Sequence, residues 1–213
     1  MSRITYERRK RALDVTFSLV GLVISLPIIF VIAITIKLTE PRDPVIFRQA
    51  RAGLNGQPFN VYKFRTMRRA TPGTEGGSNG VNTTSWTAGV PDNFIYKSSK
   101  TSALRTTKIG RVLRRTSLDE IPQLVNVLKG DMSLVGPRPE VFPIVQCYNA
   151  LQCRRLLVRP GLTGLAQVTG RSEQTHGEKI RADLLYIEQA SLRLDMKILL
   201  KTWRVAVGAR GSY

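Results

Sequence analysis

The sequence is poor in the side chains that many enzymes use for proton transfer and metal binding. Its 213 residues include one histidine, His176, and two cysteines, Cys147 and Cys153. Two cysteines cannot build a disulfide framework, and no cysteine–histidine cluster predicts a zinc site. A single histidine also argues against a Ser-His-Asp type of site. We therefore expect a protein of a reducing compartment, in which His176 is a solvated polar side chain.

Negative charge is scarce as well. The chain has 15 Asp and Glu against 33 Lys and Arg, which gives a formal net charge of +18. A surplus of this size predicts an anionic partner, such as nucleic acid, an anionic membrane surface or a phosphorylated molecule. The length suits one domain with a hydrophobic core of its own.

Charge is missing altogether from residues 15–36, a run of 22 uncharged and mostly apolar residues. As a straight helix the run would extend about 33 Å, and the hydrocarbon layer of a bilayer is about 30 Å thick. The run is too long for a signal peptide, and no cleavage site follows it. Because it is apolar on every face, it does not resemble the core helix of a soluble protein.

Pro27 lies near the middle of this run and predicts a bend, because proline removes a backbone donor. The hydroxyl of Ser25 can satisfy a backbone group that the bend sets free. Both flanks of the run are basic, and basic flanks prefer the cytoplasmic side of a membrane. We therefore expect residues 1–40 to form a re-entrant helix that enters, bends at Pro27 and returns. A proline-kinked helix that spans the membrane is the alternative.

Residues 41–213 are expected to form a small cytosolic domain of the α+β class that is mainly helical. Residues 44–64 predict two short strands, because Asn55-Gly56 is a strong hairpin signal. Residues 70–102, rich in Gly, Ser, Thr and Asn, predict a long loop that is either a mobile lid or disordered.

The remaining periodic segments predict helices. One helix is expected from Lys108, and a second begins at Pro122 and ends at Gly130. Two more are expected within residues 177–208. The last of these is basic and amphipathic, which fits an interfacial helix on an anionic membrane or an ordinary helix packed on the core.

Asp119 and Glu120 are the only adjacent acids in the chain, and Arg111, Arg114 and Arg115 precede them. Ser117 and Glu120 have the spacing of a capping box, so one reading of the acids is a simple helix cap. The nearby helix end and the arginines are expected to lower both pKa values. Ionised carboxylates beside arginines that bind phosphate can hold Mg²⁺ or attack phosphorus.

Two further motifs favour phosphate chemistry. Arg138 stands between Pro137 and Pro139, whose fixed φ angles hold the backbone rigid around a bidentate phosphate donor. Residues 159–171 form a glycine-punctuated segment between two arginines, the second of which is Arg171. Glycine-rich loops alone are weak evidence, because ordinary turns have the same composition.

Four segments, residues 47–67, 117–139, 160–171 and 183–202, resemble the bacterial sugar transferase family of small monotopic polyprenyl-phosphate phosphoglycosyl transferases. The resemblance covers nearly the whole chain. It implies a re-entrant helix broken at a proline, on the cytosolic face of the bacterial inner membrane. It also implies transfer of a sugar 1-phosphate from a UDP-sugar to undecaprenyl phosphate with release of UMP, the first membrane step of exopolysaccharide, O-antigen or glycoconjugate synthesis.

The resemblance also implies roles for individual residues. Asp119 is expected to be the nucleophile that forms an aspartyl-phosphosugar intermediate, and Glu120 to assist through Mg²⁺ positioning or proton handling. Both acids would be metal ligands. The substrate-binding residues that the family motifs imply are Lys63, Arg65, Arg105, Arg114, Pro137, Arg138, Pro139 and Arg171.

The expected partners are a UDP-sugar, undecaprenyl phosphate and anionic membrane lipids, with downstream glycosyl transferases and a second copy of the chain as further candidates. Three alternatives stay open. A basic nucleic-acid binder fits the charge, but no nucleic-acid-binding signature is present and the apolar run would have no purpose. A non-catalytic membrane scaffold would use the acids only as a helix cap. An ordinary glycosyl transferase would release UDP in place of UMP.

Overall fold

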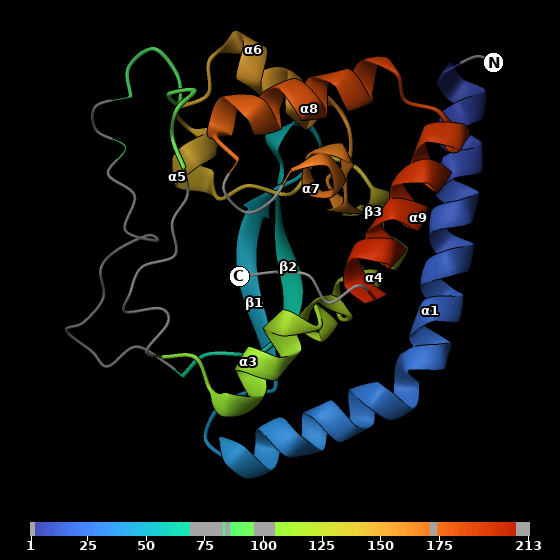
Figure 1. The fold of residues 1–213 in the computed structure, drawn as a ribbon, viewed down its shortest axis with the longest axis vertical. Coiled ribbons are helices and arrows are strands. Elements are labelled where there is room, and N and C mark those ends of the chain that lie inside the picture. The colour runs from blue at the N-terminus through green and yellow to red at the C-terminus, as the bar shows by residue number, and fades with distance from the viewer. Residues whose placement is uncertain (1–2, 69–82, 84–85, 96–104, 171–173, 208–213) are drawn as a thin grey trace.

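The computed structural model describes residues 3–68, 83, 86–95, 105–170 and 174–207. Two small sheets lie inside a mainly helical body, and the N-terminal helix α1 (Arg3–Thr39) runs along one side of it and bends beneath it (Figure 1). This architecture confirms the expected α+β class with a helical majority.

The first sheet is the predicted hairpin. β1 (Ile46–Ala52) pairs antiparallel with β2 (Pro58–Phe64), in a register that sets Ile46 opposite Phe64. Asn55 and Gly56 lie in the short 3₁₀ turn η1 (Leu54–Gly56), and both have positive φ angles, 53° and 76°. An asparagine–glycine pair adopts this left-handed conformation at little cost, so the turn chemistry predicted the hairpin correctly.

The predicted helices are also present. α3 (Lys108–Arg115) leads through η3 (Leu118–Glu120) into α4 (Gln123–Lys129), which ends at Gly130 with a φ of 90°. After α4 come β3 (Ser133–Val135), α5 (Phe142–Val145), α6 (Ala150–Cys153), η4 (Arg154–Leu157), β4 (Gly161–Thr163), α7 (Leu165–Thr169), α8 (His176–Glu188) and α9 (Leu192–Val207). β3 and β4 pair in parallel.

The core joins the hairpin to α4, β3, α8 and α9. Its buried members are Val61, Val127, Met132, Leu134, Val135, Tyr186 and Ile198. A smaller cluster forms where Trp86 and Phe94 pack against Val90, Val141 and Ile144. Residues 86–95 of the predicted 70–102 loop therefore pack against α5, and Thr83 is described as well; the other residues of that loop and Arg171 fall outside the described residues.

α1 is attached to this body at both of its ends. Near its start, Arg11 donates to the carbonyl of Leu128 in α4 (2.8 Å), and Asp14 accepts from the amide of Leu134 (3.0 Å). Near its end, Ile32 and Ile36 pack in a cluster whose other buried members belong to β2 and α3. The two ends of the apolar run thus lie against one and the same body.

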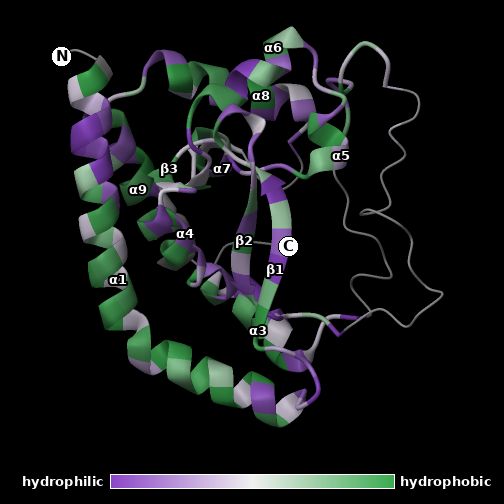
Figure 2. Ribbon diagram, turned by 180° about the vertical axis from the view of Figure 1, so that it is seen from behind, coloured by the Kyte–Doolittle hydropathy of each residue, from purple (hydrophilic) through white to green (hydrophobic). Residues whose placement is uncertain are grey.

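Between these attachments α1 carries Pro27 and changes direction (Figure 1). Its inner side holds small residues there: Ser18 is buried, and Gly21 lies beneath Leu124 of α4. Large apolar side chains of this part of α1 are exposed, and Figure 2 colours most of its ribbon as hydrophobic. In the described part of the chain α1 is the one helix long and apolar enough to cross a membrane, which indicates membrane association.

His176 does not have the solvated environment that the composition suggested. Its side chain is buried at the start of α8, beside the rings of Phe94 and Tyr148. Burial, reinforced by the charge of Arg155, lowers the pKa of His176 to about 4. The expectation was wrong because a lone histidine has no local pattern that reveals its aromatic neighbours.

A matched pair of isoleucines tests the attachment of the second half of α1. Ile36 is 1 % exposed and Ile34 is 43 % exposed, although they lie two residues apart. We expect Ile36→Ala to lower the free energy of unfolding by about 2–5 kcal/mol, because it leaves a cavity in the core. Ile34→Ala should change it little. Chemical denaturation of the detergent-solubilised protein measures both; equal effects would contradict the docking of this segment.

Candidate active site

The two adjacent acids lie in the tight corner between α3 and α4. The 3₁₀ turn η3 carries Asp119 and Glu120, and Asp119 is 7 % exposed. The predicted capping box is wrong: Ser117 has a φ of 56° and its side chain makes no cap hydrogen bond. The Glu120 side chain is engaged elsewhere, so it does not turn back to the Ser117 amide.

Glu120 binds two cations through one carboxylate oxygen. Lys63 of β2 donates to Oε1 at 2.6 Å, and Arg138 donates to the same oxygen at 3.1 Å. The Lys63 and Glu120 side chains are both mostly buried, so this contact is shielded from solvent more than a surface ion pair. The two contacts of Glu120 together join β2, η3 and the Pro-Arg-Pro segment, which are far apart in the sequence.

A third predicted cation, Arg114, lies in the last turn of α3. Its Nε donates to Thr66 Oγ1 at 3.0 Å, just beyond the end of β2. Burial raises the pKa of Asp119, and the charge of Arg114, like those of Lys63 and Arg138, partly opposes that rise. The structure therefore brings Lys63, Arg114 and Arg138 together near the two carboxylates.

The two carboxylates are in different electrostatic states. Burial raises the pKa of Asp119, and the three cations only partly oppose it. For Glu120 burial acts in the same direction, but Arg138 and Lys63 outweigh it and hold the pKa at about 2. The expected lowering of both pKa values is right for Glu120 and wrong for Asp119, because direct ion pairs reach only Glu120.

The other predicted substrate-binding residues have structural contacts. Arg65 donates to the carbonyl of Pro44 (2.8 Å) and lies over the ring of Phe47, while the guanidinium of Arg105 donates to the carbonyl of Arg68 (2.7 and 3.1 Å). The structure therefore places both arginines against backbone and gives them no hydrogen bond to the acids.

The Pro-Arg-Pro segment is held at its backbone. Pro137 accepts a hydrogen bond from the amide of Gly161, and Pro139 accepts one from the Arg51 side chain. Between them, the carbonyl of Arg138 accepts from Arg155. Sequence reasoning missed Arg155, because nothing in the local pattern separates this buried arginine from its many exposed counterparts.

The acids fit a partial site for Mg²⁺. Asp119 has no hydrogen bond or ion pair within the described residues, so its oxygens are open to a ligand, and Glu120 lies next to it in η3. No group of three or more metal-binding side chains occurs in that part of the chain. Mg²⁺ is typically held by one or two carboxylates, with phosphate oxygens and water completing the octahedron. The donor set therefore suits Mg²⁺ that arrives with a phosphate substrate.

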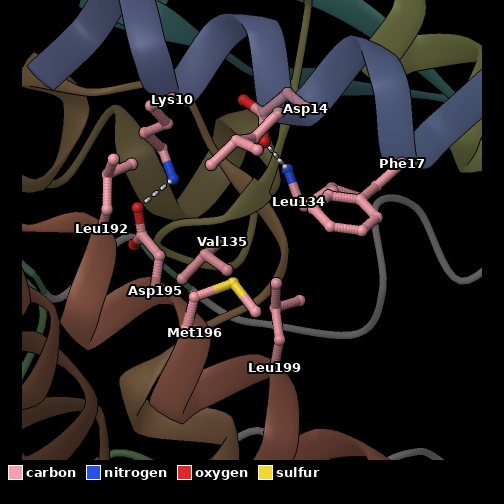
Figure 3. Close-up of a pocket in the computed structure, with 10 residues that line it drawn as sticks. Lys10, Asp14, Phe17, Leu134, Val135, Leu192, Asp195, Met196 and Leu199 are labelled. Carbon is pink, nitrogen blue, oxygen red and sulfur yellow. Dashed lines mark hydrogen bonds and ion pairs between the residues drawn. The ribbon is translucent and has the colours of Figure 1, made fainter.

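A separate hollow lies between α1 and α9, and none of the acids or cations of η3 and its surroundings lines it (Figure 3). Lys10 points across it to Asp195 at 3.0 Å, and Asp14 points to the backbone of Leu134. The hollow is the seam between the membrane helix and the body, closed at one end by this ion pair.

An isosteric pair of variants tests the contrast between the acids. We expect Asp119→Asn to raise the melting temperature, because it removes a buried carboxylate whose pKa is raised. Glu120→Gln should lower the melting temperature, with a loss of at most about 3 kcal/mol in the free energy of unfolding, because Lys63 and Arg138 lose their anion.

The pH dependence of the two effects has opposite sign. The Asp119 penalty is absent below about pH 3.8, where the unfolded chain is protonated too, and grows as the pH rises through the folded pKa. The Glu120 stabilisation is present above about pH 4.5 and is lost as the pH falls towards 2. Thermal unfolding across this range checks both; a destabilising Asp119→Asn at neutral pH would contradict the assignment.

Known proteins share this sequence over most of its length. A family model described as bacterial sugar transferase matches residues 5–209. The chain is 39 % identical over 202 residues to the uncharacterized sugar transferase EpsL of Bacillus subtilis, covering 95 % of this chain and 89 % of EpsL. It is 39 % identical over 210 residues to the UDP-glucose:undecaprenyl-phosphate glucose-1-phosphate transferase of Caulobacter vibrioides, covering 95 % and 71 %.

A longer relative matches over part of its length. The undecaprenyl-phosphate galactose phosphotransferase of Salmonella typhimurium is 36 % identical over 207 residues, which are 96 % of this chain and 41 % of that protein. The family match spans α1, the hairpin, both acids and the Pro-Arg-Pro segment. The protein that holds Glu120 between Lys63 and Arg138 therefore belongs to the bacterial sugar transferase family and is an enzyme of that family.

Proposed function

We propose that this protein transfers a sugar 1-phosphate from a UDP-sugar to undecaprenyl phosphate and releases UMP. The observation that carries the proposal is the pair of unlike carboxylates: Glu120 is fixed by two cations, while Asp119 beside it is buried and has no hydrogen bond or ion pair among the described residues. The names of the Caulobacter and Salmonella relatives support the same substrates.

The reaction has two steps at one phosphorus atom. An oxygen of the Asp119 carboxylate attacks the β-phosphorus of the UDP-sugar. The bond from that phosphorus to the oxygen bridging it to the α-phosphate breaks, and UMP leaves with the electron pair. A phosphate oxygen of undecaprenyl phosphate then attacks the same phosphorus, and the Asp119 carboxylate leaves. The product is the undecaprenyl diphosphate sugar.

The surrounding residues supply charge and position. Lys63, Arg114 and Arg138 bind the diphosphate and stabilise the charge that gathers on its oxygens during each transfer. Asp119 and Glu120 would hold Mg²⁺ together with substrate phosphates, and the ion adds charge neutralisation to that of the cations. Glu120, held in one orientation, keeps η3 in place so that Asp119 faces the phosphorus.

The attachment of α1 supports the re-entrant topology over the spanning one. Both ends of the apolar run contact the same body, through Asp14 just before the run and through Ile36, its last residue. A body on the cytosolic face therefore keeps both flanks on that face. Exposed Leu200 and Trp203 of α9 offer further apolar contact with the membrane. Basic residues near anionic lipids each add about 1 kcal/mol of attraction.

The test of the reaction is the nucleotide by-product. Detergent-solubilised protein is incubated with Mg²⁺, undecaprenyl phosphate and a panel of UDP-sugars, and UMP is measured. We expect UMP release with at least one sugar, and a loss of about 10³-fold or more in Asp119→Asn, which lacks the nucleophile. Without acceptor, intact-protein mass spectrometry should detect a sugar phosphate adduct on the wild type and none on the variant.

Three outcomes would contradict the proposal. Release of UDP in place of UMP would point to an ordinary glycosyl transferase. Normal turnover by Asp119→Asn would show that its carboxylate is not the nucleophile. Product formation in the complete assay, with no adduct on the wild type when the acceptor is withheld, would remove the covalent intermediate.

Cysteine labelling tests the topology of α1. Cys147 and Cys153 are replaced by serine, and single cysteines are introduced at exposed Arg8 and Arg42, one in each flank. In spheroplasts we expect an impermeant maleimide to label neither position, and to label both after permeabilisation, because both flanks lie on the cytosolic side. Labelling of one flank only in spheroplasts would establish the spanning alternative.

A further inference from the structure

Four consecutive carbonyl groups, those of the Pro-Arg-Pro segment and of Glu140 after it, accept hydrogen bonds from other parts of the chain. Residues 137–140 each accept a hydrogen bond from a different donor. The donors are, in chain order of their acceptors, the amide of Gly161 (2.8 Å), the guanidinium of Arg155 (3.0 Å), the guanidinium of Arg51 (3.3 Å) and the amide of Ala52 (3.1 Å). The segment is thus fixed by three other parts of the chain: η4, the start of β4 and the end of β1.

External donors are needed because of the prolines. Pro137 and Pro139 have no N–H group, so this stretch cannot form a regular backbone ladder of its own. The rest of the protein therefore holds this stretch mainly through hydrogen bonds to its carbonyl groups. Arg138 lies between the prolines, and its half-exposed side chain reaches Glu120 at 3.1 Å. The position of this guanidinium therefore depends on how firmly the carbonyls on either side of it are held.

The side chain of Arg155 is deeply buried and makes several polar contacts. Its side chain is 5 % exposed; it donates to Tyr148 Oη at 2.6 Å and lies 2.7 Å from a carboxylate oxygen of Asp183 in α8. The planar fork of an arginine can serve three acceptors at once in fixed directions, which a lysine ammonium cannot do in this geometry. One guanidinium thus ties α8, Tyr148 and the carbonyl of Arg138 together.

We propose that Arg155 is a positioning residue for the phosphate-binding Arg138. Arg155 has no contact with the carboxylates of η3; it acts by holding the Arg138 backbone so that the side chain is already placed when the diphosphate arrives. A side chain that is already in place loses less conformational freedom when the diphosphate binds, which strengthens the complex. The inference rests on the proposed function to the extent that Arg138 is taken to bind the diphosphate.

The competing account is that Arg155 only stabilises the fold. Its buried pair with Asp183 would destabilise the protein if one partner were lost. The two accounts differ in one respect: a residue that acts through Arg138 loses its effect on ligand binding once the Arg138 guanidinium is absent, whereas a general structural effect persists.

Arg155→Lys is the test variant, and Arg154→Lys is its matched control. Both keep the charge, but Arg154 is half exposed and pairs with Glu188 at the surface. Affinity for UDP is measured by isothermal titration calorimetry, and kcat/KM by UMP release. We expect Arg155→Lys to weaken UDP binding by about tenfold or more and Arg154→Lys to stay within about twofold.

A double-mutant cycle with Arg138→Met decides between the accounts. In that background we expect Arg155→Lys to change UDP affinity by less than about twofold. The same loss in both backgrounds would overturn the proposal, as would no loss in either or no binding of UDP to the wild type. If Arg155→Lys fails to unfold cooperatively in a thermal scan, Tyr148→Phe replaces it in the cycle, since it removes only the hydroxyl that the guanidinium holds.

The readouts separate this inference from the proposed function. A wild type that binds UDP and shows the expected cycle, yet releases no UMP, would refute the transferase reaction and leave the role of Arg155 standing. Normal UMP release with an additive cycle would refute the role of Arg155 alone.

Discussion

One carboxylate oxygen of Glu120 holds the centre of this protein together. It receives Lys63 from the hairpin and Arg138 from the segment after β3, and it belongs to the corner between α3 and α4. Three parts of the chain that share no local pattern therefore meet at one mostly buried anion. Because Glu120 is fixed, the neighbouring Asp119 has a defined place beside Lys63, Arg114 and Arg138, whose charges act on its carboxylate.

Acids of this cationic chain act as such centres elsewhere too. Asp195 binds Lys10 and the hydroxyls of Tyr6 and Tyr186, which joins α1 to α9. Asp183 binds Arg155 beneath the Pro-Arg-Pro segment. Asp119 differs, since it is buried and has no such contact among the described residues, and burial raises its pKa. A carboxylate kept in this state costs stability, and that cost is typical of a reacting group.

The apolar helix α1 is attached to the body by two different kinds of contact. Its first attachment is polar, through Arg11 and Asp14, and its second is apolar, through Ile32 and Ile36. The polar groups lie at the edge of the uncharged run, and the hydrophobic surface between the attachments faces outward. The helix is thus held at both ends and changes direction near Pro27 between them.

The amino-acid sequence by itself determined the features that depend on neighbours within a few residues. These include the helix over the uncharged residues 15–36, the hairpin at Asn55-Gly56, the helix that ends at Gly130, and the adjacent acids with arginines before them. Turn chemistry and hydrophobic period act over one or two turns of chain, so they can be read from the letters alone. The family motifs added the prediction that Lys63, Arg114 and Arg138 are basic residues of the site.

Only the tertiary structure decided which acid is paired and which is not. The same local sequence predicted a cap at Ser117 and low pKa values for both acids, yet Lys63 arrives from more than fifty residues away and binds Glu120 alone. The burial of His176 and the contact of Arg155 with the Arg138 carbonyl are likewise long-range. Charge interactions and desolvation depend on distance in space, and packing sets that distance, so no local pattern contains it.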